Sequence, residues 1–287
     1  MTVRTIDLAS VSPEDVRQAC EEVGFLTVVG HGVADDLVDE VAARSRAFFD
    51  LPDAEKERFR APAETRGRPV YRPLGAEKLG ANADRKASLD WGPSLAGVAW
   101  PNAELRAAYE RYYAEMLRVA STLVDAFGAA LSLDLAPFFD DRSSSMRVID
   151  YPGLETPSAK PPASGGQTAP PAAAQAGAGG ARAGAHRDYG CLTIIRSDAS
   201  GLEAQTRSGE WVAVEAPPGG LVVNIGDLMQ RWTNDRWVST LHRVVGAEGA
   251  SPRRQSLVFF HNPRADAVVD GVRAGDYILA RAAEAGL

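Results

Sequence analysis

Short apolar runs punctuated by glycine and proline dominate the second half of this 287-residue chain. From residue 190 onward six such runs follow one another, with no amphipathic helix pattern between them. They are Leu192–Ile195, Gly201–Ala204, Trp211–Val214, Leu221–Ile225, Leu241–Val245 and Ser256–Phe260. Many short strands of this kind predict a sandwich or a barrel of β-strands.

Helical periodicity is confined to the first half of the chain. Ser12 followed by Pro13 and two acidic residues indicates a helix start, and a longer helix is predicted over 105–131 because apolar and aromatic residues recur there at steps of three and four. Phe25–Val29 reads as a buried strand. We therefore expect a helical and strand-containing support over 1–135 and a β core over 136–287.

One segment has no core-forming capacity. Of the 28 residues from 155 to 182, 19 are Ala, Pro or Gly, and none is aromatic or a large aliphatic. Such a segment cannot bury enough surface to offset its ordering entropy, so we expect a flexible insertion. A lid that orders on substrate is possible on this pattern, but a tolerated low-complexity loop is favoured.

Composition and charge limit the kinds of molecule that this protein is expected to bind. The net charge of −7 argues against a nucleic-acid or anionic-membrane surface and favours a small-molecule partner. No apolar run reaches membrane-spanning length and no signal peptide is evident, so we expect a cytoplasmic protein. Only four of the 31 basic residues are Lys, which suggests a GC-rich bacterial genome. The pattern gives no oligomeric state.

Candidate metal ligands stand at the edges of two apolar runs. His186 and Asp188 precede the run at 191–195, and on a strand residues two apart face the same way. His242 opens another run, 54 positions after Asp188. Two His and one carboxylate on one face of a metal form the facial triad of non-haem Fe(II) oxygenases, whose opposite face is open.

Arg254 and Ser256 follow His242 and begin the next strand. A guanidinium beside a hydroxyl is suited to hold a carboxylate. The ordered pattern His-X-Asp, a gap of about fifty residues, His, then Arg-X-Ser resembles the isopenicillin N synthase-like branch of the Fe(II)/2-oxoglutarate-dependent oxygenases. Further similarity is carried by 219–227, 231–234, 239–244 and 259–263, and near the N-terminus by 24–33.

This resemblance implies a double-stranded β-helix, or jelly roll, with Fe(II) bound by His186, Asp188 and His242. It implies O₂ and 2-oxoglutarate as co-substrates, with Arg254 and Ser256 binding the distal carboxylate and Tyr151 contributing to that pocket. The expected reaction is hydroxylation of a small molecule, or its desaturation or cyclisation, in bacterial specialised metabolism.

Substrate contacts are harder to assign. The segment 62–94 resembles the part of the family that lies over the barrel mouth, so Tyr71, Arg72 and Trp91 are candidates, and so is Tyr189 beside the metal ligands. Packing or solvated loop roles compete with each of them. His31, between two glycines, is expected to be a hydrogen-bonded turn residue and not a ligand.

Three alternatives stay open on the sequence. The first is an iron oxidase that takes its electrons from substrate and does not use 2-oxoglutarate, because those relatives share the Arg-X-Ser motif. The second is a non-catalytic jelly-roll binding protein, for which intact ligands and an intact Arg clamp are unexpected. The third is a zinc hydrolase, in which the Arg clamp has no evident purpose.

Overall fold

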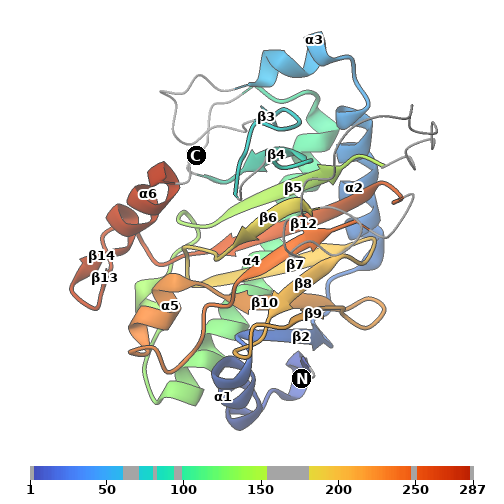
Figure 1. The fold of residues 1–287 in the computed structure, drawn as a ribbon. Coiled ribbons are helices and arrows are strands. Elements are labelled where there is room, and N and C mark those ends of the chain that lie inside the picture. The colour runs from blue at the N-terminus through green and yellow to red at the C-terminus, as the bar shows by residue number, and fades with distance from the viewer. Residues whose placement is uncertain are drawn as a thin grey trace, which may run out of the picture.

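The computed structural model describes residues 3–60, 71–79, 83–93, 99–153, 181–246 and 251–284. Two β-sheets of unequal size face each other, and helices cover the outer face of the larger one (Figure 1). This arrangement confirms the prediction of a mainly β jelly roll with flanking helices.

The major sheet has eight strands in the order β1-β2-β10-β7-β12-β5-β4-β3. All neighbours run antiparallel except β1 and β2, which are parallel. Its strands are β1 (Arg4–Asp7), β2 (Phe25–Val29), β3 (Tyr71–Arg72), β4 (Ala87–Trp91), β5 (Ser145–Tyr151), β7 (Leu192–Ser197), β10 (Leu221–Ile225) and β12 (Arg254–His261).

The minor sheet has four antiparallel strands in the order β6-β11-β8-β9. They are β6 (Ala181–His186), β8 (Leu202–Gln205), β9 (Trp211–Ala213) and β11 (His242–Val245). A separate hairpin of β13 (Val268–Val269) and β14 (Val272–Arg273) precedes the last helix. The six runs found in the sequence thus coincide with strands, within two residues at their ends.

Side-chain alternation divides the apolar residues into two cores. On β12, Val258 faces the minor sheet, whereas Leu257 and Phe259 face the helices. The inner core between the sheets contains far fewer residues than the core beneath the helices. Its members from the minor sheet include the short side chains of Ala183 and Val244. Because small residues leave space between the sheets, the inner side of the sandwich can hold a cavity.

Helices supply the second layer. They are α1 (Pro13–Glu22), α2 (Asp35–Phe49), α3 (Asp53–Lys56), α4 (Ala103–Leu131), α5 (Asp227–Trp232) and α6 (Ala274–Glu284), and short 3₁₀ turns include η1 (Leu8–Ser10), η2 (Glu57–Phe59) and η4 (Ala136–Phe138). As predicted, Ser12 caps α1, since its hydroxyl accepts from the Asp15 amide. The aromatic stripe of α4 is buried against the major sheet, where Tyr113 packs edge-on to Phe259.

Strands from both halves of the sequence share the major sheet. β2, from the first 30 residues, pairs with β10, and β4 pairs with β5. The division at residue 135 stays a prediction. Most of the expected insertion at 155–182 lies outside the described residues, but its last two residues begin β6. Among the residues described, no helix has the length and apolar character needed to cross a bilayer.

Candidate active site

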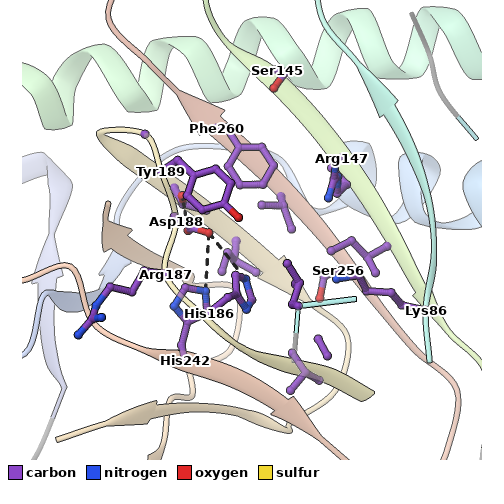
Figure 2. Close-up of a pocket in the computed structure, with 18 of the residues that line it drawn as sticks. Lys86, Ser145, Arg147, His186, Arg187, Asp188, Tyr189, His242, Ser256 and Phe260 are labelled. Carbon is purple, nitrogen blue, oxygen red and sulfur yellow. Dashed lines mark hydrogen bonds and ion pairs between the residues drawn. The ribbon is translucent and has the colours of Figure 1, made fainter. Parts of the chain in front are cut away.

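A cavity of about 380 Å³ opens between the two sheets (Figure 2). Its walls come from β5, β7 and β12 of the major sheet and from β6 and β11 of the minor sheet, and α6 covers part of the mouth. The cavity holds His186, Asp188, His242, Tyr151, Arg254 and Ser256. Six of the residues singled out in the sequence therefore line one space.

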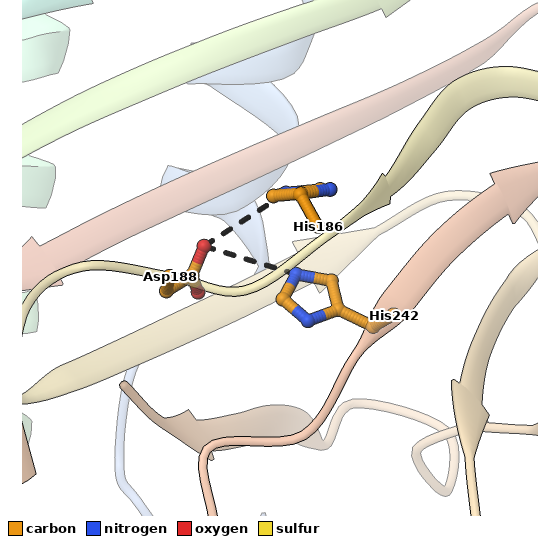
Figure 3. A group of neighbouring side chains, drawn as sticks. All are labelled: His186, Asp188 and His242. Atoms are coloured by element: carbon orange, nitrogen blue, oxygen red, sulfur yellow. Dashed lines mark ion pairs between the residues drawn. The ribbon is translucent and has the colours of Figure 1, made fainter. Parts of the chain in front are cut away.

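The three candidate metal ligands converge at this cavity (Figure 3). His186 ends β6 and His242 begins β11, and the two are register partners across the minor sheet. Oδ1 of Asp188 lies 3.9 Å from Nε2 of His186 and 3.7 Å from Nε2 of His242. One ligand atom from each residue lies within 4.8 Å of the others, so a single ion can reach all three.

Hydrogen bonds leave one atom of each ligand free. Nδ1 of His186 lies 2.9 Å from the Gly184 carbonyl, and Nδ1 of His242 lies 3.0 Å from the Thr240 carbonyl. Each carbonyl accepts the Nδ1 proton, which leaves the Nε2 lone pair for a metal. Oδ2 of Asp188 accepts from Thr193 Oγ1 at 2.6 Å and from Asn224 Nδ2 at 2.7 Å, so Oδ1 remains available.

The local electrostatics favour the protonation states that bind a cation. Burial, with a contribution from neighbouring His242, lowers the pKa of His186 to about 3. Burial alone would raise the pKa of Asp188, but the two imidazoles and the hydrogen bonds from Asn224 and Thr193 hold it below its usual value. A neutral imidazole and an ionised carboxylate are the forms that a divalent metal requires.

The path between the first two ligands differs from the prediction. Asp188 does not lie on a strand with His186, because β6 ends at His186 and the chain then crosses from the minor sheet to β7 in the major sheet. The first amides of α5 hold this crossover: Asp227 N donates to the Asp188 carbonyl at 2.8 Å, and Leu228 N donates to that of Gly190 at 3.1 Å. The convergence comes from a turn of the chain and not from strand alternation.

Arg254 lies deep in the cavity and is 2% exposed. Its Nε donates to the carbonyls of Ala199 and Ser200, and its two terminal nitrogens donate to the hydroxyls of Ser256 and Ser197. Within the described part of the chain, no carboxylate forms an ion pair with Arg254. A buried guanidinium without a counter-ion is costly, so an anionic ligand at this position would be stabilised.

Two family models match the chain over most of its length. The N-terminal model, described as non-haem dioxygenase in morphine synthesis N-terminal, matches residues 5–111, and the 2OG-Fe(II) oxygenase superfamily matches residues 147–263. The validamycin A dioxygenase of Streptomyces hygroscopicus subsp. limoneus is 31% identical over 89% of this chain and 73% of its own length. The chain belongs to the Fe(II)/2-oxoglutarate-dependent oxygenases.

Other relatives agree with this family. The 2-oxoglutarate-dependent dioxygenase citB of Monascus ruber is 31% identical, over 91% of this oxygenase and 81% of its own length. The dioxygenase for auxin oxidation 1 from Arabidopsis thaliana, solved with 2-oxoglutarate, has the same fold, with a TM-score of 0.71, 22% identity and coverage of 96% of this chain and 99% of its own. The oxygenase uses Fe(II), O₂ and 2-oxoglutarate and acts on a small molecule. The three alternatives left open by the sequence are therefore disfavoured.

Tyr151 and Arg182 complete the wall around Arg254 in the oxygenase. The guanidinium carbons of Arg254 and Arg182 lie 5.0 Å and 5.4 Å from the centre of the Tyr151 ring. Arg182 also donates to the backbone carbonyls of Tyr151 and Pro152, at 2.6 Å and 2.7 Å. Burial, with repulsion from Arg254, lowers the pKa of Arg182. The sequence assigns Arg182 to the flexible insertion and so gives no sign of this buried contact.

A buried ion-pair cluster borders the cavity of the oxygenase. It contains Arg72, Glu77, Asp84, Lys86, Asp90 and Arg147. From the sequence, Lys86 is only a loop charge and Arg147 has no assigned role. Arg147 lies four residues before Tyr151 on β5, so strand alternation places both on the inner face. This even spacing from Tyr151 is the sequence feature that could have identified Arg147 as a cavity residue.

The predicted substrate residues fall into two groups. Arg72 and Tyr189 line the cavity of the oxygenase. Tyr71 and Trp91 do not: Tyr71 packs against Phe48, and Trp91 packs against Tyr113 and Trp100, on the helix-covered side of the major sheet. The reason is strand alternation, which turns Tyr71 away from the face that carries Arg72. For these two residues the packing interpretation is the one that fits.

Three further polar residues lie in or near the major sheet: His31, Thr193 and Asn224. His31 is a buried turn residue, with Nε2 2.8 Å from the Gly219 carbonyl and Nδ1 accepting from the Val33 amide, as expected. Thr193 and Asn224, which orient Asp188, were missed. Each is a polar residue that faces inward from an apolar strand, β7 or β10, and a polar residue in such a run is a detectable signal.

Proposed function

We propose that His186, Asp188 and His242 bind Fe(II), that Arg254 and Ser256 bind the distal carboxylate of 2-oxoglutarate, and that Tyr151 contributes to the 2-oxoglutarate pocket. We further propose that the enzyme hydroxylates a C–H bond of a small molecule, in the cytoplasm of a bacterium and within specialised metabolism. The bound iron would supply oxygen activation, coupled to the conversion of 2-oxoglutarate to succinate and CO₂.

The observation that carries this proposal is the unpaired guanidinium of Arg254 in the same cavity as three convergent metal ligands. A carboxylate delivered there would gain charge-assisted hydrogen bonds from a group that is already buried. Ser256 and Ser197 orient the guanidinium from the side. The Tyr151 ring covers one face of it and excludes water from the ion pair.

The chain's own hydrogen bonds also orient the three proposed metal ligands. The Gly184 and Thr240 carbonyls fix the imidazole tautomers, and Thr193 and Asn224 fix the carboxylate. Such outer contacts set the orientation and basicity of metal ligands. The predominance of Arg over Lys supports a GC-rich bacterial source, and the two buried free thiols, Cys20 and Cys191, suit a reducing compartment.

The test is an anaerobic titration of Fe(II)-loaded protein with 2-oxoglutarate, followed by visible absorption. Bidentate binding of the keto acid to iron is expected to give a weak charge-transfer band. The band should disappear in His242→Ala and require much more 2-oxoglutarate in Arg254→Leu. Arg253→Leu is the matched control, because Arg253 pairs with Asp50 and Asp150 outside the cavity. Iron-loaded protein that never shows the band would contradict the proposal.

A further inference from the structure

The charged side chains around the cavity bear on the kind of substrate it can hold. The described lining contains five Arg or Lys residues and one carboxylate: Arg72, Lys86, Arg147, Arg187, Arg254 and Asp188. The proposed function, on which this inference rests, commits Asp188 to the metal and Arg254 to 2-oxoglutarate. The question is whether the other four could bind a charged substrate.

Three of the four are neutralised inside the ion-pair cluster. Arg147 donates to Asp90 through two nitrogens, both at 2.7 Å, and to Glu77 at 3.1 Å. Lys86 contacts Glu77 at 3.1 Å and Asp84 at 2.9 Å. The remaining cation of the cluster, Arg72, lies 3.3 Å from both Glu77 and Asp90.

The cluster therefore has three positive and three negative groups, and its net charge is zero. A substrate carboxylate would therefore meet a cluster with no net positive charge and would gain little attraction to offset the loss of its own hydration. Arg187 is exposed, donates to the Ser239 carbonyl at 2.7 Å and points away from the metal ligands (Figure 2). Three of the four cations are thus already paired with carboxylates, and the fourth points away from the metal ligands.

The outer part of the cavity is apolar. One face of α6 presents Ile278, Leu279 and Ala282 to it, spaced as helix neighbours, and Phe260 and Leu79 add further apolar surface. Leu279 is 43% exposed, although it lines the cavity. An apolar ligand beneath α6 would cover this side chain and gain the free energy of removing apolar surface from water.

The position of α6 is tied to the metal-ligand loop. Arg281 lies with its guanidinium carbon 5.1 Å from the centre of the Tyr189 ring and with Nη2 3.5 Å from Asp227. Tyr189 directly follows Asp188 and lines the cavity. These contacts hold the apolar face of α6 over the cavity mouth, so the apolar lining is a built part of the site.

We propose that the substrate of this oxygenase is an uncharged molecule with an apolar, ring-sized face that binds under α6, against Leu279 and Phe260. A carboxylate or ammonium group pressed against this apolar face would be desolvated without a charged partner there. Specificity for uncharged substrates thus comes from the closed ion-pair cluster together with the apolar face of α6.

Three probes of similar size test this inference: 1-naphthol, 1-naphthoate and 1-naphthylmethylamine. Their binding to anaerobic protein saturated with Fe(II) and 2-oxoglutarate is measured by calorimetry, with the charge-transfer band recorded on the same samples. We expect 1-naphthol to bind at least about tenfold more tightly than either charged probe, a difference of about 1.4 kcal/mol.

A charge placed under α6 should reverse part of this preference. Leu279→Arg is expected to weaken 1-naphthol binding and strengthen 1-naphthoate binding, because it adds an unpaired cation to the apolar face. Leu133→Arg is the matched control: Leu133 is 48% exposed, lies outside the cavity and should leave the wild-type ratio unchanged. Both sites are partly exposed, so neither change should prevent folding.

The outcomes separate the substrate class from the proposed function. Binding of 1-naphthoate as tightly as 1-naphthol, failure of 1-naphthol to bind, or an unchanged ratio in Leu279→Arg would each overturn the inference if the charge-transfer band is present. In that case the proposed function stands. If the band itself never forms, the proposed function is wrong, and the preference for uncharged probes must be judged from the calorimetry alone.

Discussion

The inner end and the outer part of the cavity are built in different ways. At the inner end, the metal ligands and Arg254 are oriented by nearby backbone carbonyls and hydroxyls, and each functional group keeps the capacity for one more partner. Elsewhere in the lining, every cation of the ion-pair cluster is already paired, and the outer part, under α6, is apolar. The inner end is prepared for charged partners, whereas the outer part selects against them.

The difference teaches where reaction and specificity reside. On the proposed function, reaction depends on residues at the ends of β6, β11 and β12 and in the turn that follows β6. Specificity depends on elements that approach from elsewhere in the chain, β3, β4 and α6. Substitutions at the inner end should therefore change the binding of Fe(II) or 2-oxoglutarate, whereas substitutions in the ion-pair cluster should change stability.

The largest effect is expected from His242→Ala. Removing one of three ligands should weaken Fe(II) binding by at least about 100-fold, since losing even an outer contact of a ligand commonly costs about 10- to 100-fold. Iron content after gel filtration measures this. His31→Ala removes a buried His outside the cavity and should retain iron. Equal iron loss in His242→Ala and His31→Ala would contradict the assignment of the metal site to the cavity.

Arg254→Leu should mainly affect 2-oxoglutarate. Leaving a carboxylate desolvated without its partner costs about 2–5 kcal/mol, which is roughly a 30- to 5,000-fold loss of affinity. Fe(II) binding should be unchanged, because Arg254 is not among the metal ligands. Calorimetric titration with 2-oxoglutarate measures the loss, and Arg253→Leu should bind it as the wild type does. Unchanged affinity in Arg254→Leu would remove the assignment.

The ion-pair cluster should respond to Glu77→Gln through stability and not through co-substrate binding. Removing one partner of a buried ion pair costs about 3–5 kcal/mol, and this is measured as a lower free energy of unfolding in urea. The exposed Glu110→Gln serves as control. A Glu77→Gln protein that is as stable as the wild type but binds 2-oxoglutarate poorly would show that the two regions are not separate.

Glu77 also predicts a pH dependence. Burial raises the pKa of Glu77, but Arg147, Lys86 and Arg72 outweigh it and hold the pKa at about 2, below the ordinary 4.5. A depressed folded-state pKa contributes stability above the ordinary pKa, and this is lost as pH falls toward 2. The free energy of unfolding should thus decrease between about pH 4.5 and 2, and less steeply in Glu77→Gln. Parallel curves for the two proteins would contradict this.

A smaller effect is expected from Thr193→Val, which keeps side-chain shape but removes the hydrogen bond to Asp188. Fe(II) affinity should fall by about 10-fold, at the low end for loss of an outer contact, because Asn224 still holds the carboxylate. Competition with a colorimetric chelator measures it. Thr5→Val, at a distant threonine of β1, should leave Fe(II) affinity unchanged.

Much of the inner end could be predicted from the sequence because its residues lie at recognisable strand boundaries. His242 and Arg254 do begin β11 and β12. The position of Asp188 could not be derived, since the turn between sheets depends on contacts with α5, which follows much later in the chain. Short apolar runs separated by Gly and Pro predicted a sandwich or a barrel of β-strands, and the family resemblance implied the jelly roll.

The outer part could not be predicted for a physical reason. The cluster joins Glu77 to Arg147, 70 residues away, and no local pattern encodes such a pair. The sequence left Tyr71 and Trp91 open between substrate contact and packing, because β3 has only two residues, too few to show which face is buried, and because an aromatic suits either face of β4. The position of α6 over the cavity likewise depends on tertiary packing alone.

The order of strands in the major sheet has a consequence for synthesis of the protein. β12 lies between β5 and β7, which precede it in the chain, so these two strands have no partner between them until residues 254–261 leave the ribosome. Open strand edges invite pairing with other chains. A nascent chain, or one truncated before Arg254, would carry a split sheet and depend on chaperones to avoid aggregation.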